Sequence, residues 1–226
     1  MLLSESFASA LWLGLWVGGL VALAAALIAH LNLYALLSLH VKRSSLTPLW
    51  IMGLSVPVFI PYAVMALVLF LWFYPSGFIG AFFPSLMGSS VGLVLAYSIK
   101  TGAFLTLLGI PSLMASKSSA WVQYRLHSKS LFGFFMHTLV PKLWASMVVG
   151  MYVIHAYVLG AYEIPYLIGS RISPMPSVVI HDTFHKLAQD SAKEAYMMSG
   201  WLVLVMLSLA PMYYLFYRFV DKRLKP

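Results

Sequence analysis

Long apolar segments separated by short polar connections dominate the chain. A helix needs about 20 apolar residues to cross a bilayer, and five segments meet that length, at approximately residues 7–36, 49–73, 88–114, 138–162 and 195–217. The first is too long for a cleaved signal peptide and follows no basic stretch, so we interpret it as a span. The pattern predicts an all-α, polytopic membrane protein with five transmembrane helices in a single domain over residues 1–226.

Composition supports the membrane assignment. Of the 226 residues, 62% are hydrophobic and 9% are charged, whereas a soluble domain is about 25% charged. Charges this sparse cannot cover a water-soluble globule. The absence of cysteine excludes disulfides and thiolate metal sites. The net charge of +8 comes mostly from span ends and forms no basic stripe, which argues against a nucleic-acid partner and for a lipid bilayer.

The distribution of cations predicts the orientation. Basic residues gather on the cytoplasmic side of membrane proteins. Ten cations lie on one side of the predicted spans, after the first span, in or just after the central loop, and in the C-terminal tail. They are Lys42, Arg43, Lys117, Arg125, Lys129, Lys142, Arg218, Lys222, Arg223 and Lys225. The opposite side holds only Arg171, Lys186 and Lys193. We therefore expect the N-terminus outside and the C-terminus inside.

Two connections stand out from the apolar pattern. The loop over residues 115–137 mixes cations with apolar residues and predicts a short cytoplasmic helix that lies against a partner. The outer loop over residues 163–194 begins with three prolines and one glycine, Pro165, Gly169, Pro174 and Pro176, which predict a non-helical stretch. A short amphipathic helix is expected to follow at residues 178–188.

The second span and the connection after it have unusual backbone signals. Pro57 and Pro61 lie inside the span, and each removes a helical hydrogen bond and favours a kink. Residues 74–83, YPSGFIGAFF, are uncharged and rich in aromatic residues. They predict either a short outer loop or a re-entrant turn.

Two motifs resemble a known family. The central loop ends in Val140 and Pro141, as does the cytoplasmic loop of type I ABC importer permeases, although residues 122–124 are Val-Gln-Tyr instead of Glu-Ala-Ala and Ser128 replaces a glycine. Residues 159–169, LGAYEIPYLIG, are similar to the segment after the next span in the polyamine, thiamine and iron subgroup. The chain thus resembles a binding-protein-dependent permease with a degenerate Glu-Ala-Ala loop.

The resemblance implies a type I permease core in a bacterial inner membrane. Such a subunit forms half of a solute pathway, pairs with a second permease subunit of the same or a divergent sequence, and receives solute from an extracytoplasmic binding protein. It is not itself an enzyme and holds no cofactor, because ATP and Mg are bound by partner ATPase subunits. The resemblance assigns coupling to the ATPase to Trp121, Tyr124, Arg125, Leu126, Ser128, Lys129 and Pro141. It assigns the outer gate to Glu163, Pro165 and Gly169.

Ionisable residues inside the spans are candidates for the pathway. A cation at mid-membrane costs at least about 2.5 kcal/mol, and all six acids of the chain lie outside the spans, so Lys100 needs water or a partner. It is expected either to face the pathway and meet an anionic solute or a carboxylate of the partner permease, or to bond backbone carbonyls or extend toward water. His155 is a second pathway candidate, although an intramembrane histidine also serves as a helix–helix hydrogen bond. The same alternatives apply to His30.

His181 and His185 are four residues apart and share one helix face. This spacing suits part of a zinc site, but no third ligand is evident and Asp182 is expected to point elsewhere. We therefore favour a solvated helix face.

Two other classes of function stay open at this point. One is a structural or assembly subunit of a membrane complex, and the other is an intramembrane enzyme that uses Lys100 and the histidines. The solute is also open among polyamine, thiamine, iron chelate and organic anion, with Lys100 favouring negative charge. The sequence does not say whether the permease is a homodimer or a heterodimer.

Overall fold

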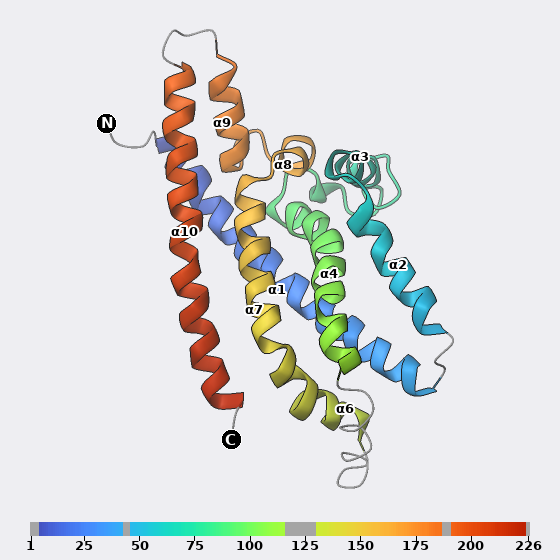
Figure 1. Cartoon of the computed structure of the whole chain (residues 1–226). Coiled ribbons are helices and arrows are strands. Elements are labelled where there is room, and N and C mark those ends of the chain that lie inside the picture. The colour runs from blue at the N-terminus through green and yellow to red at the C-terminus, as the bar shows by residue number, and fades with distance from the viewer. Residues whose placement is uncertain (1–4, 43–45, 116–129, 187–190, 225–226) are drawn as a thin grey trace.

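The computed structural model describes residues 5–42, 46–115, 130–186 and 191–224 (Figure 1). Within these ranges every regular element is a helix, which confirms the all-α prediction. Four helical stretches are long and apolar enough to cross a membrane. They are Glu5–Leu39, Ser90–Ala115, Leu131–Gly160 and Ser191–Arg223.

These stretches correspond to named helices. The first lies in α1 (Glu5–Lys42), the second is α4 (Ser90–Ala115) and the last lies in α10 (Ser191–Leu224). The third begins with α6 (Leu131–Phe134), continues through a five-residue π-helical segment, η3 (Phe135–Leu139), and becomes α7 (Val140–Gly160). In this stretch the π segment accommodates a local change of helical pitch.

The expected second span is broken in two. Helix α2 (Thr47–Phe59) and helix α3 (Tyr62–Phe73) meet at a bend of 96°. Pro61 lacks an amide proton and disfavours helical geometry in the residue before it, and Ile60 is extended with ψ 128°. Pro57 stays inside α2. The expected distortion of this segment is therefore present at Pro61 and is a sharp bend, and the number of spans is four, or five if the bent pair is one span.

The core forms where α1 crosses α4 and α7 (Figure 1). Small residues allow this close approach: a Cβ on Gly102 would lie 2.7 Å from Ile28 Cγ2, and one on Gly109 would lie 2.7 Å from Leu33 Cδ1. The face of α1 that meets these helices is itself lined by alanines, namely Ala22, Ala25 and Ala29, all fully buried. Small residues on both helices therefore allow α4 to pack closely against α1.

One end of the bundle carries α8 (Glu163–Ile168) and α9 (Pro176–Phe184). The expected non-helical stretch is wrong for residues 163–168, because Pro165 lies in the first turn of α8, where the missing amide proton is not needed. Helix α9 matches the predicted short helix but begins earlier and ends at Phe184. We call this the α8–α9 end.

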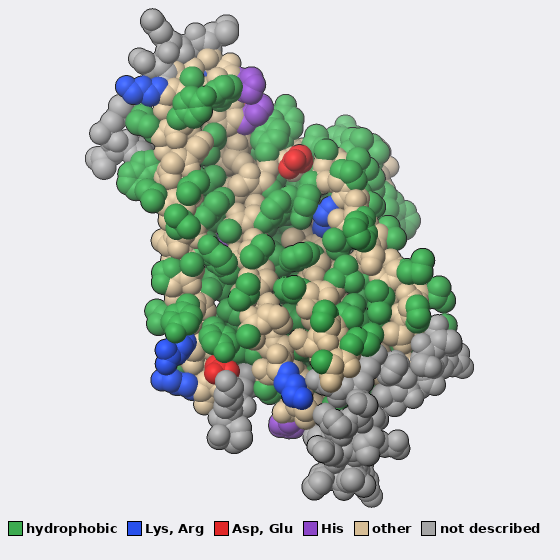
Figure 2. Space-filling model, in the orientation of Figure 1, with side chains coloured by type: hydrophobic (Ala, Val, Ile, Leu, Met, Phe, Trp, Pro, Cys, Tyr) green, Lys and Arg blue, Asp and Glu red, His purple; other side chains and the backbone are tan. Residues whose placement is uncertain are grey.

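The opposite end is formed by α6 and the last turns of α10 (Figure 1). Exposed cations, including Lys142, Lys222 and Arg223, lie there. Figure 2 shows Lys and Arg side chains gathered at this end below a broad hydrophobic band. We call it the basic end.

Candidate functional site

The buried lysine of α4 is the centre of the site. Lys100 is only 4% exposed, and its Nζ donates a hydrogen bond to the carbonyl of Ile60. In a continuous helix that carbonyl would accept from the amide four residues on, so the break before Pro61 is what leaves it available. Nζ also lies 3.9 Å from the centroid of the Tyr62 ring, within the range of a cation–π contact.

Three tyrosines from three helices form a cluster that contacts this lysine through Tyr62. The rings of Tyr62 on α3 and Tyr157 on α7 have centroids 4.6 Å apart, with their planes 34° from parallel. Tyr97 on α4 is fully buried and meets Tyr157 edge-on at 6.3 Å. The Tyr97 hydroxyl donates to the carbonyl of Ala161 at 3.5 Å. The site therefore depends on the mutual position of α3, α4 and α7.

Glu163 lies at the edge of this tyrosine cluster. Glu163 is the first residue of α8. Its carboxylate is close enough to the phenols of Tyr62, Tyr97 and Tyr157 to act on them electrostatically. Over the described residues, no carboxylate forms an ion pair with Lys100. The cluster thus extends from an acid at the α8–α9 end, through aromatic hydroxyls, to an unpaired cation inside the bundle. We call Lys100, Tyr62, Tyr97, Tyr157 and Glu163 the lysine–tyrosine cluster.

The chemistry of the cluster favours anionic groups. An ammonium group has three donors, and Lys100 uses one on Ile60. The remaining donors and the phenolic hydroxyls can donate to carboxylate or phosphate-like oxygens. A buried cation without an acidic partner also gains electrostatic energy when an anion arrives.

His155, the other predicted pathway residue, belongs to a different contact. Its Nδ1 lies 3.1 Å from the hydroxyl of Tyr213 on α10. The other edge of the ring faces Gly18 on α1, where an added Cβ would come within 2.5 Å of Cδ2. The side chain joins α7 to α1 and α10, as the helix–helix alternative expected, whereas Lys100 joins α4 to the α2–α3 break.

The predicted gate residues lie together in α8. Pro165 is buried there, and its carbonyl accepts a hydrogen bond from the Gly169 amide at 3.0 Å. A Cβ on Gly169 would lie 2.4 Å from the same oxygen, so this close turn requires glycine. Glu163 therefore stands on a short helix whose end is fixed by Pro165 and Gly169.

Most of the predicted coupling residues cannot be placed. Trp121, Tyr124, Arg125, Leu126, Ser128 and Lys129 lie outside the described residues. Pro141 is described: it lies in the first turn of α7, directly after the π segment, and is partly buried.

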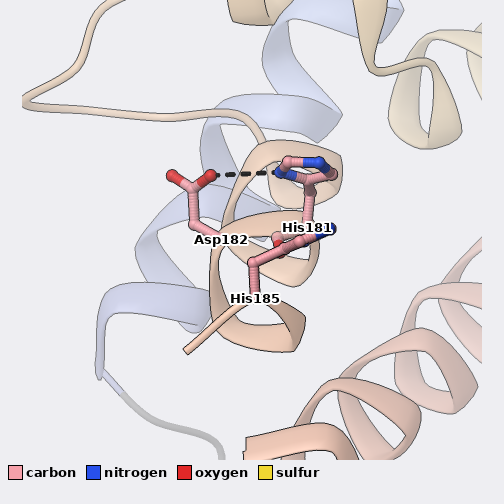
Figure 3. Close-up of polar contacts among 3 residues, drawn as sticks. All are labelled: His181, Asp182 and His185. Atoms are coloured by element: carbon pink, nitrogen blue, oxygen red, sulfur yellow. Dashed lines mark hydrogen bonds and ion pairs between the residues drawn. The ribbon is translucent and has the colours of Figure 1, made fainter. Parts of the chain in front are cut away.

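His181 and His185, at the C-terminal end of α9, bring their rings together on the surface (Figure 3). The rings of His181 and His185 have centroids 4.2 Å apart. His181 Nδ1 lies 3.2 Å from Asp182 Oδ1, so the expectation that Asp182 points elsewhere was wrong. His185 Nδ1 lies 2.9 Å from the carbonyl of His181. Within the described ranges no three His, Cys, Asp or Glu residues are grouped to hold a metal.

A pocket of about 390 Å³ opens beside this pair, between α9 and α10. Tyr162 borders it and packs against His181, with ring centroids 4.3 Å apart. Burial raises the pKa of the Tyr162 phenol, and the neighbouring Tyr166 and Asp182 act in the same direction. The phenol therefore stays neutral at physiological pH and can donate a hydrogen bond.

Comparison with protein-family models and with curated proteins finds no match to this chain.

Three members of the lysine–tyrosine cluster were missed in the sequence. Tyr97 was detectable, because it precedes Lys100 by three residues and a helix brings such residues to one face. Tyr62 and Tyr157 carry no comparable signal. Tyr62 reaches the lysine because the chain turns at Pro61. Tyr157 reaches Tyr62 and Tyr97 because α7 packs against α4.

Proposed function

We propose that this chain is the transmembrane permease subunit of an ATP-driven importer and forms half of the solute pathway. The observation that carries the proposal is a buried lysine that contacts Ile60 and Tyr62 at a broken helix and has no carboxylate partner among the described residues. Intramembrane cations are costly and concentrate on transport pathways. Discontinuous helices are a recurring device of transporter binding sites, since their free backbone groups face the solute.

The connectivity of the site suits coupling to an external motor. Lys100 is on α4, which leads into the loop over residues 116–129, and Tyr157 is on α7, to which that loop leads through α6 and η3. A partner ATPase that grips and displaces this loop would move both helices. The two sides of the lysine–tyrosine cluster would then separate or close, which is the change that alternating access needs.

The proposed solute carries negative charge. Lys100 offers free donors, and no acid of the described spans competes for it. Glu163, at the α8–α9 end, would face the arriving solute and the binding protein that delivers it. A second permease subunit would supply the other half of the pathway, and ATP and Mg would stay on the partner ATPases.

The decisive experiment is purification of the full-length tagged chain in mild detergent from its own membranes. We expect an ATPase subunit to co-purify and the reconstituted complex to hydrolyse ATP. Reversing charge in the loop, by Arg125→Glu with Lys129→Glu, is expected to release the ATPase, because both cations would meet its acids. Arg171→Glu, at the α8–α9 end, is the matched control and should leave the complex intact.

A stable complex that contains no ATPase would contradict the importer assignment. It would favour the alternative function, a non-transporting assembly subunit whose loop is only an attachment point. Retention of the ATPase by the charge-reversed loop would contradict the coupling role of Arg125 and Lys129 specifically.

A further inference from the structure

An aromatic turn follows the broken helix pair. Helix α3 ends at Phe73, and residues 74–89 fold back beside it before α4 begins. The turn presents large apolar side chains to its surroundings: Phe78 is 79% exposed and Phe82 is 76% exposed. Exposed phenylalanines in a turn are unfavourable in water, so the turn needs an apolar neighbour.

The geometry points to a lipid neighbour. We propose that α3 and the turn over residues 74–87 lie within the membrane leaflet at the α8–α9 end, with Phe78 and Phe82 inserted among the acyl chains. This segment would be a re-entrant element of one leaflet rather than part of a straight span. The inference is independent of the proposed transport function, since it concerns only where the segment sits.

The lengths of the two helices support this placement. Helix α2 has 13 residues and is about 20 Å long, whereas the hydrocarbon core is about 30 Å thick. A helix that starts at the basic end and stops after 13 residues reaches the far leaflet but does not leave it. The 96° bend then directs α3 roughly along the membrane plane. In Figure 1 α3 is seen nearly end-on while α4, α7 and α10 run down the view.

The chemistry of the surface supports it as well. Residues 44–99 contain no Asp, Glu, Lys, Arg or His. The exposed apolar surface of α2, which includes Phe59, continues around the bend onto Leu67 and Leu71 of α3 and then onto the turn. Figure 2 shows hydrophobic side chains covering this edge of the molecule. By contrast, the neighbouring segment over residues 163–185 carries charges and histidines, which suit water.

The backbone of the turn is suited to a medium without water. In hydrocarbon each amide or carbonyl must be bonded within the protein. The amides of Ile79 and Gly80 both donate to the Trp72 carbonyl at 2.9 Å, which closes the C-terminal end of α3. Those of Phe82 and Phe83 donate to the Ile79 carbonyl at 3.0 Å. This coil requires glycine at position 80, where a Cβ would lie 2.0 Å from the Tyr74 carbonyl.

Spin labelling of the full-length chain tests the proposal directly. The chain has no cysteine, so Phe78→Cys or Phe82→Cys alone can carry a nitroxide. Leu27→Cys, 63% exposed on the flank of α1, is the lipid control, and Ile172→Cys, 94% exposed between α8 and α9, is the water control. The proteins are reconstituted in vesicles of phosphatidylcholine and phosphatidylglycerol. Collisions with oxygen, which dissolves in lipid, and with a polar nickel chelate, which stays in water, are then measured.

We expect the oxygen-to-nickel collision ratio at positions 78 and 82 to match that at position 27 and to exceed that at position 172 several-fold. A ratio like that at position 172 would place the turn in water and overturn the proposal. Protection from both reagents would mean that protein covers the turn, for example a second copy of the chain, and would overturn it equally. Phe83→Cys, 61% exposed in the same turn, replaces either variant if it fails to fold.

Discussion

Lys100 is the residue on which the proposed pathway depends. Its ammonium group links the α2–α3 break to α4 through Ile60 and Tyr62, and it has no carboxylate partner among the described residues. Lys100→Met keeps an unbranched apolar stem of similar length but removes the ammonium group and its hydrogen-bond donors. A hydrogen bond to a charged group contributes roughly 1.5–3 kcal/mol, so we expect ATP-dependent uptake of the preferred anion to fall about ten- to a hundredfold.

The measurement compares uptake of a panel of labelled anions by vesicles that hold the reconstituted complex. Lys193→Met, which removes an exposed cation at the α8–α9 end, is the control and should transport normally. Lys100→Arg keeps the charge and should retain part of the activity. Unchanged uptake by Lys100→Met, with the protein present at the same level, would remove Lys100 from the pathway.

At this scale the sequence revealed the lysine but not its environment. An isolated cation within an apolar segment is visible without a structure, and the need for a partner follows from its cost in lipid. That the partner is the Ile60 carbonyl depends on a 96° bend, whose size no residue pattern specifies. His155 was assigned to the same pathway for the same reason, yet it bonds Tyr213 on another helix.

Among the elements, the broken helix pair has the clearest measurable consequence. A straight helix would separate residues 50 and 71 by about 32 Å, whereas two helices at a right angle would separate them by about 20 Å. We expect spin labels on Trp50→Cys and Leu71→Cys, both exposed positions, to give the shorter distance in lipid vesicles. Replacing Pro61 by Ala restores the amide proton and should add a population at the longer distance.

Pro57→Ala is the matched control, because Pro57 lies inside α2 and its removal leaves the break in place. A single distance near the straight-helix value in the parent protein would mean that the pair forms one ordinary span. The lysine would then lose the free carbonyl that defines its site.

Long elements were predictable from the sequence, whereas the shortest ones, α8 and the π segment, were not. Helices of 26 residues or more, such as α4, are recognisable as long segments that are almost entirely apolar. Helix α8 has six residues and contains Pro165, so local signals favour a turn. It forms because Ile164 and Ile168 are buried against the bundle, a tertiary effect that overrides propensity. The π segment before α7 likewise has no signal in its five residues.

For the whole molecule, the orientation in the membrane is the property that every functional statement requires. The basic end holds α6 and the last turns of α10, while Arg171 belongs to the α8–α9 end. Cations near span ends are retained on the cytoplasmic side. We therefore expect the basic end to face the cytoplasm, where ATP is available to a partner ATPase.

Single cysteines in intact cells measure this orientation, because the chain has none of its own. A maleimide that cannot cross membranes should label Ile172→Cys, which is highly exposed between α8 and α9, without permeabilisation. It should label Arg223→Cys, exposed on the last turn of α10, only after permeabilisation. Labelling of both after permeabilisation is the control for reactivity. The reverse pattern would put the loop over residues 116–129 outside the cell, away from ATP, and would exclude the importer function. It would not affect the helical bundle or the proposed placement of α3 in one leaflet, which are tested separately.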